Sequence, residues 1–323
     1  MEKKRMTSIV FMGTPAFASV ILEGLIKKNY DIKAVVTQPD RLTGRKRKLT
    51  ASPVKKVALE NKIKVLQPEK IAGSQELAQI VALAPDLIVT AAFGQFLPDR
   101  LIEAAKVGAI NVHGSLLPKY RGGAPVQYAI MNGENKTGVT IIYMIKKMDA
   151  GDMLAQAEMP ITGKDDTGTI FEKMSVLGRD LLLKTIPNLV DGKIQAKPQD
   201  ESAVSFSPII SPAQEELALN QTAQELDWKI RALRPAPGAY FKMFNGKRTK
   251  LWQITPLEEE TDLEAGCVVA VDKHQIKVAA AKKTVYQIDI LQPAGKPRMK
   301  VTDYLNGIGQ NIKTGQRVIV NGK

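Results

Sequence analysis

The first two hundred residues alternate short apolar runs with stretches in which apolar residues recur every third or fourth position. The runs predict buried strands, because a strand covered on both faces is apolar throughout, and the recurring positions predict helices packed on a sheet. Strands that alternate with helices in this way are typical of a parallel α/β sheet. The expected strands are 8–12, 32–37, 86–90, 110–113 and 139–144.

Two helix starts are marked by a hydroxyl residue followed by proline. Thr14-Pro15 and Ser52-Pro53 each predict an N-cap with proline in the first helical turn. The turn over 13–18 lacks the glycine spacing with which a dinucleotide-binding fold approaches a pyrophosphate. No nicotinamide cofactor is therefore expected.

A long helical pattern over 167–189 closes the first half, and the polar, proline-punctuated segment 197–212 that follows it is expected to be a linker. Beyond that segment, one helix over 224–233 precedes short strands at close intervals, which is typical of a small β-barrel. We expect a Rossmann-like α/β domain over 1–205, with a mostly parallel sheet and helices on both faces, and a smaller OB-like β-barrel domain over 206–323. The expected barrel strands are 239–244, 249–254, 267–271, 276–279 and 284–291.

Composition narrows the class of protein. The hydrophobic content of 44% is sufficient for two cores. The single cysteine, Cys267, has no partner for an internal disulfide, and we expect it to begin a barrel strand as a small core side chain. His274 is expected at the surface between strands. The N-terminal apolar run is too short for a signal peptide, and no run approaches the roughly 18 residues of a membrane span, so we expect a cytoplasmic protein without a membrane role.

The formal net charge of +13 favours polyanions as partners, and nucleic acid is the obvious candidate. The densest charge lies over 40–48, which reads Asp-Arg-Leu-Thr-Gly-Arg-Lys-Arg-Lys. This connection is longer than the roughly 2 to 6 residues usual between a strand and a helix. Its place above the strand ends favours contact with a phosphate-bearing substrate, although a solvated loop without a ligand is the alternative.

Two residues at the end of the fourth expected strand are candidates for catalysis. Asn111 and His113 are two positions apart, so their side chains share one face of the strand. In open sheets of this kind, ligands bind at the carboxyl ends of the strands. An amide donor beside a histidinium suits a reaction in which a carbonyl oxygen becomes negative. The alternative is a core histidine next to a turn asparagine.

An acidic loop follows the expected strand over 139–144. A carboxylate from Asp149 or Asp152 would hold the tautomer of His113 and favour its charged form if the two met in space. The alternative is that both aspartates shape a turn beside Gly151. The residues alone leave this choice open.

Two motifs carry a resemblance to a known family. The segment 111–125 reads Asn-Val-His-Gly-Ser-Leu-Leu-Pro-Lys-Tyr-Arg-Gly-Gly-Ala-Pro, and 148–153 reads Met-Asp-Ala-Gly-Asp-Met; together they resemble the folate-dependent formyltransferases. The segments 37–41, 52–55 and 291–296 resemble the members that act on tRNA. The chain is thus similar, over nearly its whole length, to the methionyl-tRNA formyltransferase family.

The resemblance implies transfer of formyl from 10-formyltetrahydrofolate, a cosubstrate, to the amino group of initiator methionyl-tRNA, with tetrahydrofolate released and no metal involved. It implies that Asn111 and His113 stabilise the oxyanion, while Asp149 orients His113 and assists proton transfer. A monomer is expected. The implied folate-binding residues are Ser115, Leu116, Leu117, Pro118, Phe93, Gly94, Gln95, Phe96 and Leu97. The implied tRNA-binding residues are Arg41, Arg45, Lys46, Arg47 and Lys48.

Two departures from the family pattern bear on tRNA contacts of the second domain. The run 235–238 reads Pro-Ala-Pro-Gly, without the tryptophan common between those prolines, and 205–210 lacks a lysine that relatives often place there. Two other functions are compatible with parts of the pattern. A formyltransferase for a nucleotide-linked amino sugar would have little use for the basic connection, and a non-catalytic RNA-binding protein would not require the Asn, His and Asp.

Overall fold

The structure is a computed structural model, and it describes residues 6–44, 47–243 and 246–320. The chain forms two compact units. The first unit comprises the described residues up to 125 together with 136–160 and 171–208. Two early segments, 126–135 and 161–170, pack with the described residues from 209 onward to form the second unit.

The first unit is built on a seven-stranded sheet in the order β5-β2-β1-β6-β7-β8-β9. Neighbouring strands from β5 to β7 are parallel, whereas β8 runs antiparallel to β7 and β9 antiparallel to β8. The mostly parallel sheet confirms the predicted fold class, and every predicted strand is present. The strands are β1 Ser8–Gly13, β2 Asp31–Val36, β5 Val65–Leu66, β6 Leu87–Ala91, β7 Gly108–His113, β8 Lys136–Tyr143 and β9 Met153–Pro160.

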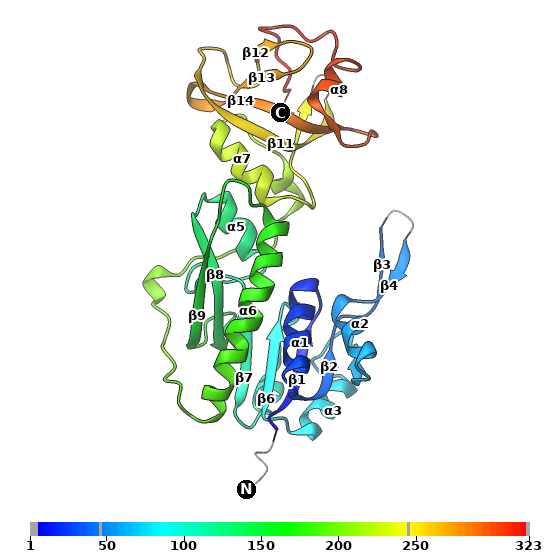
Figure 1. Cartoon of the computed structure of the whole chain (residues 1–323), viewed down its shortest axis with the longest axis vertical. Coiled ribbons are helices and arrows are strands. Elements are labelled where there is room, and N and C mark those ends of the chain that lie inside the picture. Colours follow the sequence, from blue (N-terminus) through cyan, green and yellow to red (C-terminus); the bar gives the residue numbers. More distant parts are fainter. Residues whose placement is uncertain (1–5, 45–46, 244–245, 321–323) are drawn as a thin grey trace. The chain divides into compact units, whose positions relative to one another are not determined.

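Helices cover both faces of this sheet, as predicted. Val10 and Met12 of β1 join a core cluster with Leu77 of α3 and Leu101 of α4. On the opposite face, Gly178 of α6 lies against side chains of β7, β8 and α1, and Figure 1 shows α1 and α6 in front of the strands. These helices are α1 Ala16–Lys27, α2 Pro53–Glu60, α3 Gln75–Leu83, α4 Asp99–Ile102 and α6 Thr167–Val190, whereas α5 Pro125–Met131 belongs almost entirely to the second unit.

The two predicted helix starts have different outcomes. Ser52 caps α2 as predicted, since its hydroxyl accepts a hydrogen bond from Lys55 N at 3.0 Å. The prediction for Thr14 is wrong, because Pro15 is the N-cap of α1 and makes no side-chain cap. The Thr14 hydroxyl instead donates to the carbonyl of Phe93 at 3.3 Å. The Thr14 hydroxyl, which the local sequence predicts as a helix cap, is thus hydrogen-bonded to the Phe93 carbonyl, beyond the end of β6.

The second unit contains a six-stranded antiparallel sheet in the order β10-β11-β14-β13-β12, with β15 beside β14. The C-terminal segment 315–320 joins the two edges of this sheet: Val320 N donates to Lys242 O at 2.8 Å, and Val268 N donates to Gln316 O at 2.9 Å. The sheet is thereby closed into a small barrel, in agreement with the predicted β-barrel domain. Its strands are β10 Tyr240–Met243, β11 Lys247–Glu260, β12 Val268–Val271, β13 Ile276–Ala279, β14 Thr284–Pro293 and β15 Met299–Lys300.

The second unit also contains two helices, α7 and α8, and the two side chains for which the sequence made a prediction, His274 and Cys267. The helix α7, Ala223–Ala232, begins with a capping box between Thr222 and Glu225, and α8 is Val301–Leu305. His274 is exposed between β12 and β13, as predicted. Cys267 forms a β-bridge with Arg317 directly before β12, close to the predicted strand start, but it is half-buried, so the prediction of a core side chain is wrong. Phe244, the last residue of a predicted barrel strand, lies outside the described residues.

Candidate active site

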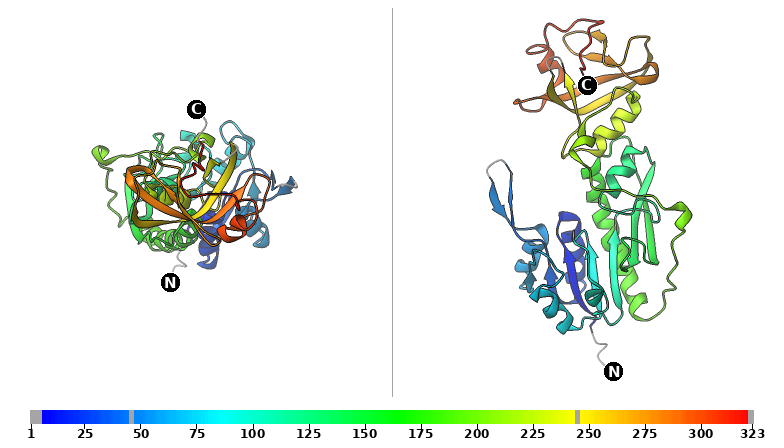
Figure 2. Two further views of the ribbon diagram at one scale, coloured as in Figure 1. Left: turned by 90° about the horizontal axis from the view of Figure 1, so that it is seen from above. Right: turned by 180° about the vertical axis from the view of Figure 1, so that it is seen from behind.

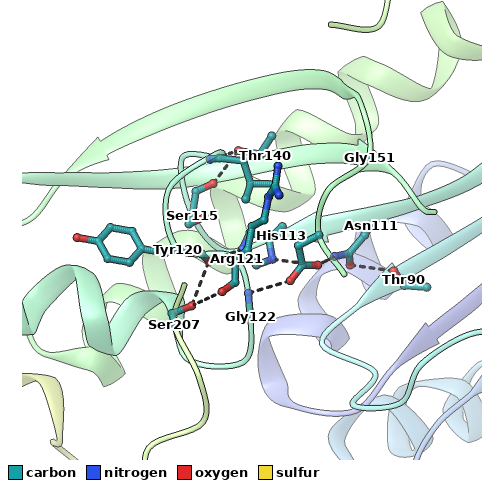
Figure 3. Close-up of polar contacts among 12 residues, drawn as sticks. Thr90, Asn111, His113, Ser115, Tyr120, Arg121, Gly122, Thr140, Gly151 and Ser207 are labelled. Carbon is teal, nitrogen blue, oxygen red and sulfur yellow. Dashed lines mark hydrogen bonds and ion pairs between the residues drawn. The ribbon is translucent and has the colours of Figure 1, made fainter. Parts of the chain in front are cut away.

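Asn111 lies on β7 opposite Thr90 of the neighbouring strand β6. The Thr90 hydroxyl donates a hydrogen bond to Asn111 Oδ1 at 2.8 Å (Figure 3). Because the amide oxygen is held in this way, the Nδ2 group faces the other side, where it lies 3.4 Å from Asp149 Oδ1. The amide therefore presents its N–H donor in one fixed direction.

His113 ends the same strand and is buried, with 5% of its surface exposed. Its Nε2 lies 3.0 Å from the carbonyl oxygen of Tyr120. A carbonyl only accepts, so Nε2 carries a hydrogen and Nδ1 is the nitrogen that can gain or lose a proton. Nδ1 lies 3.7 Å from Asp149 Oδ1, outside hydrogen-bond distance. The bond that orients the ring thus comes from Tyr120, and the predicted orienting role of Asp149 stays a prediction.

Asp149 lies in the loop between β8 and β9, with φ of 51°, in the left-handed region. Its Oδ2 accepts a hydrogen bond from Gly122 N at 2.9 Å. Its Oδ1 faces both Asn111 Nδ2 and His113 Nδ1. The structure thus brings together the three residues that the sequence singles out, and we call Asn111, His113 and Asp149 the catalytic cluster after the role predicted for them.

The predicted folate segment 115–118 follows β7 directly, and its backbone is tied to β8. Thr140 Oγ1 donates to Ser115 O at 2.7 Å and accepts from Leu117 N at 3.0 Å. The Ser115 hydroxyl donates to Lys119 O, and the Leu117 side chain is buried. Ser115 and Leu117 therefore hold the loop in shape. Leu116 and Pro118 are half-buried, and they are the side chains of this segment with surface left for a ligand.

The second predicted folate segment, 93–97, follows β6, so both segments leave the carboxyl ends of neighbouring strands. Phe93 and Leu97 are buried in the core. The Gln95 amide is used within the protein, because its Oε1 accepts from Ile71 N at 2.7 Å. Gly94 has φ of 86° and is exposed, and Phe96 has 73% of its surface exposed. Gly94 and Phe96 are therefore the two exposed residues of this segment, and Gln95 is half-buried.

The basic connection, in which the sequence shows no strand, forms a hairpin of β3 Arg41–Thr43 and β4 Lys48–Thr50 (Figures 1 and 2). Arg41 makes a two-pronged contact with Glu69, at 2.6 and 3.2 Å, so its guanidinium already has an acidic partner. Arg47 and Lys48 are exposed. The other two predicted tRNA-binding residues, Arg45 and Lys46, lie outside the described residues.

Several residues around the cluster carry no recognisable signal in the sequence. Arg121 belongs to the motif 111–125, yet its burial, with 1% of its surface exposed, is not expected for a lone arginine. Gln199 and Ser207 come from the proline-punctuated segment that the sequence suggests is a linker. Gln199 binds Arg121 through its amide oxygen. The partners of these residues are distant in sequence, so the contacts can be identified only in the folded structure.

Glu201 lies at the surface end of the same network, with Arg121 Nη2 at 2.8 Å and Lys147 Nζ at 3.0 Å. Hydrogen bonds from Arg121 and Lys147 lower the pKa of Glu201 to about 2, from an ordinary 4.5. A carboxyl group whose pKa is lower in the folded state stabilises it above the ordinary pKa, and this contribution is lost as the pH falls through the lowered value.

We therefore expect Glu201→Gln to lower the urea midpoint slightly near neutral pH, since Glu201 and Lys147 are exposed and surface ion pairs contribute little, while the buried Arg121 keeps Gln199 as a partner. The difference from wild type is expected to shrink as the pH falls from 4.5 towards 2. Urea unfolding curves recorded across this pH range measure it. A difference that stays constant down to pH 2 would contradict the role assigned to the ionised carboxylate.

A cavity of about 750 Å³ lies within the second unit. Trp228 lines it together with Arg231 and Arg234. Arg231 Nε is 2.8 Å from Asp227 Oδ2, and Arg234 Nε is 2.7 Å from Asp166 Oδ2, so both cations have carboxylate partners. The groups suited to acyl transfer are those of the catalytic cluster, in the first unit.

Neither a metal-binding cluster nor a membrane-spanning helix is found among the described residues. No group of three or more His, Cys, Asp or Glu side chains in this part of the chain is placed to hold a metal ion. Across the same residues, no helix combines the length and the apolar character needed to cross a membrane.

The class of protein follows from the sheet, the cluster at its strand ends and two family matches. The family model described as "Formyl transferase" matches residues 6–186, and the model described as "Formyl transferase, C-terminal domain" matches residues 209–309. The chain belongs to the formyl transferase family. The resemblance read from the motifs 111–125 and 148–153 is thereby confirmed.

Within that family, full-length relatives are methionyl-tRNA formyltransferases, and the chain belongs with them. The relative from Ligilactobacillus salivarius is 68% identical over 314 residues, which cover 97% of this chain and 99% of the relative. The relative from Lactiplantibacillus plantarum is 62% identical over 316 residues, again covering 97% and 99%. A solved structure of WlaRD, a sugar 3N-formyl transferase in the presence of dTDP and 5-N-formyl-THF, has a TM-score of 0.67 at 19% identity, covering 91% of this chain and 100% of that chain. At that identity it shows the shared fold.

Proposed function

We propose that the protein transfers the formyl group of 10-formyltetrahydrofolate to the α-amino group of initiator methionyl-tRNA and releases tetrahydrofolate. The observation that carries the proposal is the convergence of two donors on one anionic oxygen. Asn111 Nδ2 and His113 Nδ1 lie 3.4 and 3.7 Å from Asp149 Oδ1. Donors that meet at one oxygen are what acyl transfer needs, since the carbonyl oxygen of the donor becomes negative in the transition state. The acceptor is inferred from the names of the relatives.

The chemistry assigns one role to each member of the cluster. The amine attacks the formyl carbon, and the oxygen that becomes negative accepts hydrogen bonds from Asn111 Nδ2 and from a protonated His113 Nδ1. The Asp149 carboxylate takes the proton that the attacking amine loses. The bond between the formyl carbon and folate N10 then breaks, and that proton ends on N10. The contacts in the free enzyme are long, and they are expected to shorten when substrate binds.

The remaining assignments follow from what is left exposed. Leu116, Pro118, Gly94 and Phe96 have free surface at the ends of β6 and β7, and we assign them to the folate site. The described residues Arg47 and Lys48 present exposed cations that suit a tRNA phosphate backbone. A cytoplasmic location fits a tRNA substrate. Because the catalytic cluster comes from one chain, we expect a monomer to be active.

The test is formyl transfer from 10-formyltetrahydrofolate to methionyl-tRNA, with an amino-sugar nucleotide present as a competing acceptor. Rapid formylation of the tRNA, with no effect of the sugar, is the expected result. Turnover of the sugar alone would retain the chemistry and overturn the acceptor. No turnover of either would favour an RNA-binding protein without catalytic activity.

The hairpin makes a separate prediction about tRNA binding. Replacing Arg47 and Lys48 together by alanine is expected to raise KM for methionyl-tRNA and leave kcat and the folate KM within about twofold. The reason is that contacts to tRNA phosphates position the substrate, and these two residues are not among the groups assigned to the reaction. The slope of log KM for tRNA against log salt should fall by about 2, roughly one for each phosphate that is no longer neutralised.

Steady-state kinetics at several salt concentrations measure this effect. Lys28→Ala, which removes another exposed lysine of the same unit, is the control and should leave the slope unchanged. An equal change of slope in both variants would show that general charge, and not the hairpin, binds the tRNA.

A further inference from the structure

The segment 199–207, which we call the return segment, comes back from the end of α6 to the catalytic cluster. It contacts two loops that are distant in sequence: residues 120–124, which follow β7, and residues 149–151, which connect β8 to β9. The first of these loops provides Tyr120 O for His113 and the second contains Asp149. The return segment therefore binds the backbone on both sides of the catalytic pair.

Gln199 connects the two loops through a single side-chain amide. Its Oε1 accepts hydrogen bonds from Arg121 Nε at 3.0 Å and Arg121 Nη2 at 2.9 Å. Its Nε2 donates to the carbonyl of Asp149 and to that of Gly151, both at 2.8 Å. An amide has two N–H donors and two acceptor sites on its oxygen, and all four are used here. A group bonded in this way has one orientation.

Ser207 fixes the other loop at the point where it meets His113. Its hydroxyl lies 3.1 Å from Tyr120 O, the same carbonyl that accepts from His113 Nε2, and 3.2 Å from Arg121 O. Its backbone N–H donates to Arg121 O at 2.7 Å, and its carbonyl accepts from Ala124 N at 3.0 Å. A ladder of this kind holds the backbone of residues 120–124 from one side.

The same loop reaches Asp149 from its other side. Gly122 N donates to Asp149 Oδ2, while the Arg121 side chain acts on Asp149 O through Gln199. Asp149 has a left-handed backbone, which a non-glycine residue keeps only where its surroundings impose it. The carbonyl that Gln199 binds belongs to this strained residue, so the amide acts on the backbone that aims the carboxylate.

We propose that Gln199 is a positioning residue for formyl transfer, which with the buried Arg121 holds the backbone of Asp149 and so sets the distance between its carboxylate and His113 Nδ1. The inference rests on the proposed function. It assigns a role in the reaction to a segment that the sequence alone predicts to be a linker. The Arg121–Gln199 pair then affects the rate of the reaction in addition to the stability of the fold.

The substitution Gln199→Glu removes the hydrogen bonds that Gln199 donates and keeps those that it accepts. The side chain keeps its length and still accepts from Arg121, but it no longer has an N–H to donate to Asp149 O and Gly151 O. We expect kcat to fall by about 10- to 100-fold, since misplacement of a reacting group by about 1 Å costs on the order of 10²-fold. The KM values for 10-formyltetrahydrofolate and methionyl-tRNA should stay within about twofold, because Gln199 is buried and its amide is bonded within the protein.

Two further variants make the result decisive. Glu201→Gln replaces the acidic partner of Arg121 by an amide of the same length. It should leave kcat within about twofold, because Glu201 contacts the Asp149 loop only through the Lys147 side chain and not through the backbone of residues 149–151. Gln199→Met removes the donors without adding a charge. It also removes the acceptor for Arg121, which keeps Glu201 as a partner, and it serves if the glutamate variant does not fold. An unchanged kcat in a folded Gln199 variant, or an equal loss in Glu201→Gln, would overturn the proposal.

Hydrogen exchange measures the positioning directly and does not depend on turnover. Backbone amides of residues 149–153 should exchange faster in Gln199→Glu than in wild type, while those of α1 should not change. Faster exchange in a protein whose wild type forms no formylmethionyl-tRNA would support the positioning role and reject the proposed function. Unchanged exchange in this loop would reject the positioning role, whatever the wild-type activity.

Discussion

The His113→Ala variant is expected to fold and to lose about 10²- to 10³-fold in kcat, the usual cost of removing one donor to an oxyanion. Nδ1 of His113 is the donor concerned, because Nε2 is held by Tyr120 O at 3.0 Å. Tyr120 O keeps the Ser207 hydroxyl as a partner in the variant, so the substitution leaves no unpaired carbonyl at this position. The KM values should change little, because the hydrogen bond from Nδ1 forms mainly in the transition state.

A matched pair of variants tests which ring nitrogen acts. The amide nitrogen of asparagine falls near the position of Nδ1, and that of glutamine falls near the position of Nε2. His113→Asn therefore keeps a donor towards Asp149, whereas His113→Gln keeps only the contact with Tyr120 O. We expect the asparagine variant to retain the higher kcat in single-turnover assays. A more active glutamine variant would show that Nε2, and not Nδ1, serves the reaction.

The fold could be predicted from the sequence where each strand is buried on both faces. The apolar runs of β1 and β6 need no information from outside the run, because every position in them is buried. The sequence does not predict the strand β9, because its positions are half-buried or exposed and the polar Gln156 and Glu158 interrupt the apolar pattern. An edge strand such as β9 is recognised by its hydrogen bonds to the neighbouring strand β8, and this pairing is seen only in the folded sheet.

The catalytic cluster could be predicted in part, and for a geometric reason. The alternation of side chains along a strand places Asn111 and His113 on one face before any tertiary contact is known. Asp149 joins them only because β8 pairs antiparallel with β7, with Asn111 opposite Ile142, so that the chain turns back at the ends of these strands. The sequence therefore shows two of the three groups as neighbours and leaves the third to the family resemblance.

The supporting residues were not predictable from local patterns. Gln199 is 50 residues from Asp149, and Ser207 is 87 residues from Tyr120, so neither pair has a spacing that a helix or strand would reveal. The hydroxyl of Thr14 shows the same limit, since it binds a carbonyl 79 residues away and does not cap the adjacent helix. Where a polar side chain has several possible hydrogen-bond partners, the tertiary structure determines which of them it binds.

Gly151→Ala is expected to have the second large effect, because a methyl group at this position overlaps the carbonyl oxygen of Tyr143. Backbone cannot rotate away as a side chain can, so the loop between β8 and β9 must shift. Gly151 O accepts from Gln199 Nε2, and Tyr143 N donates to Asp152 O at 3.0 Å, so the shift disturbs bonds on both sides of Asp149. Overpacking of this kind costs about 1–3 kcal/mol in stability.

The same shift moves the carboxylate of Asp149, so kcat should fall by on the order of 10²-fold. Urea unfolding and formyl-transfer kinetics measure the two effects separately. Gly163→Ala is the control, because a Cβ there meets no atom within 4 Å and should change neither quantity. Wild-type kcat in a destabilised Gly151→Ala protein would mean that this glycine only shapes the turn. A loss of both stability and kcat would show that the shape of the turn and the direction of the Asp149 carboxylate depend on the same glycine. The Asp-Ala-Gly-Asp loop would then both shape a turn and position a carboxylate for His113.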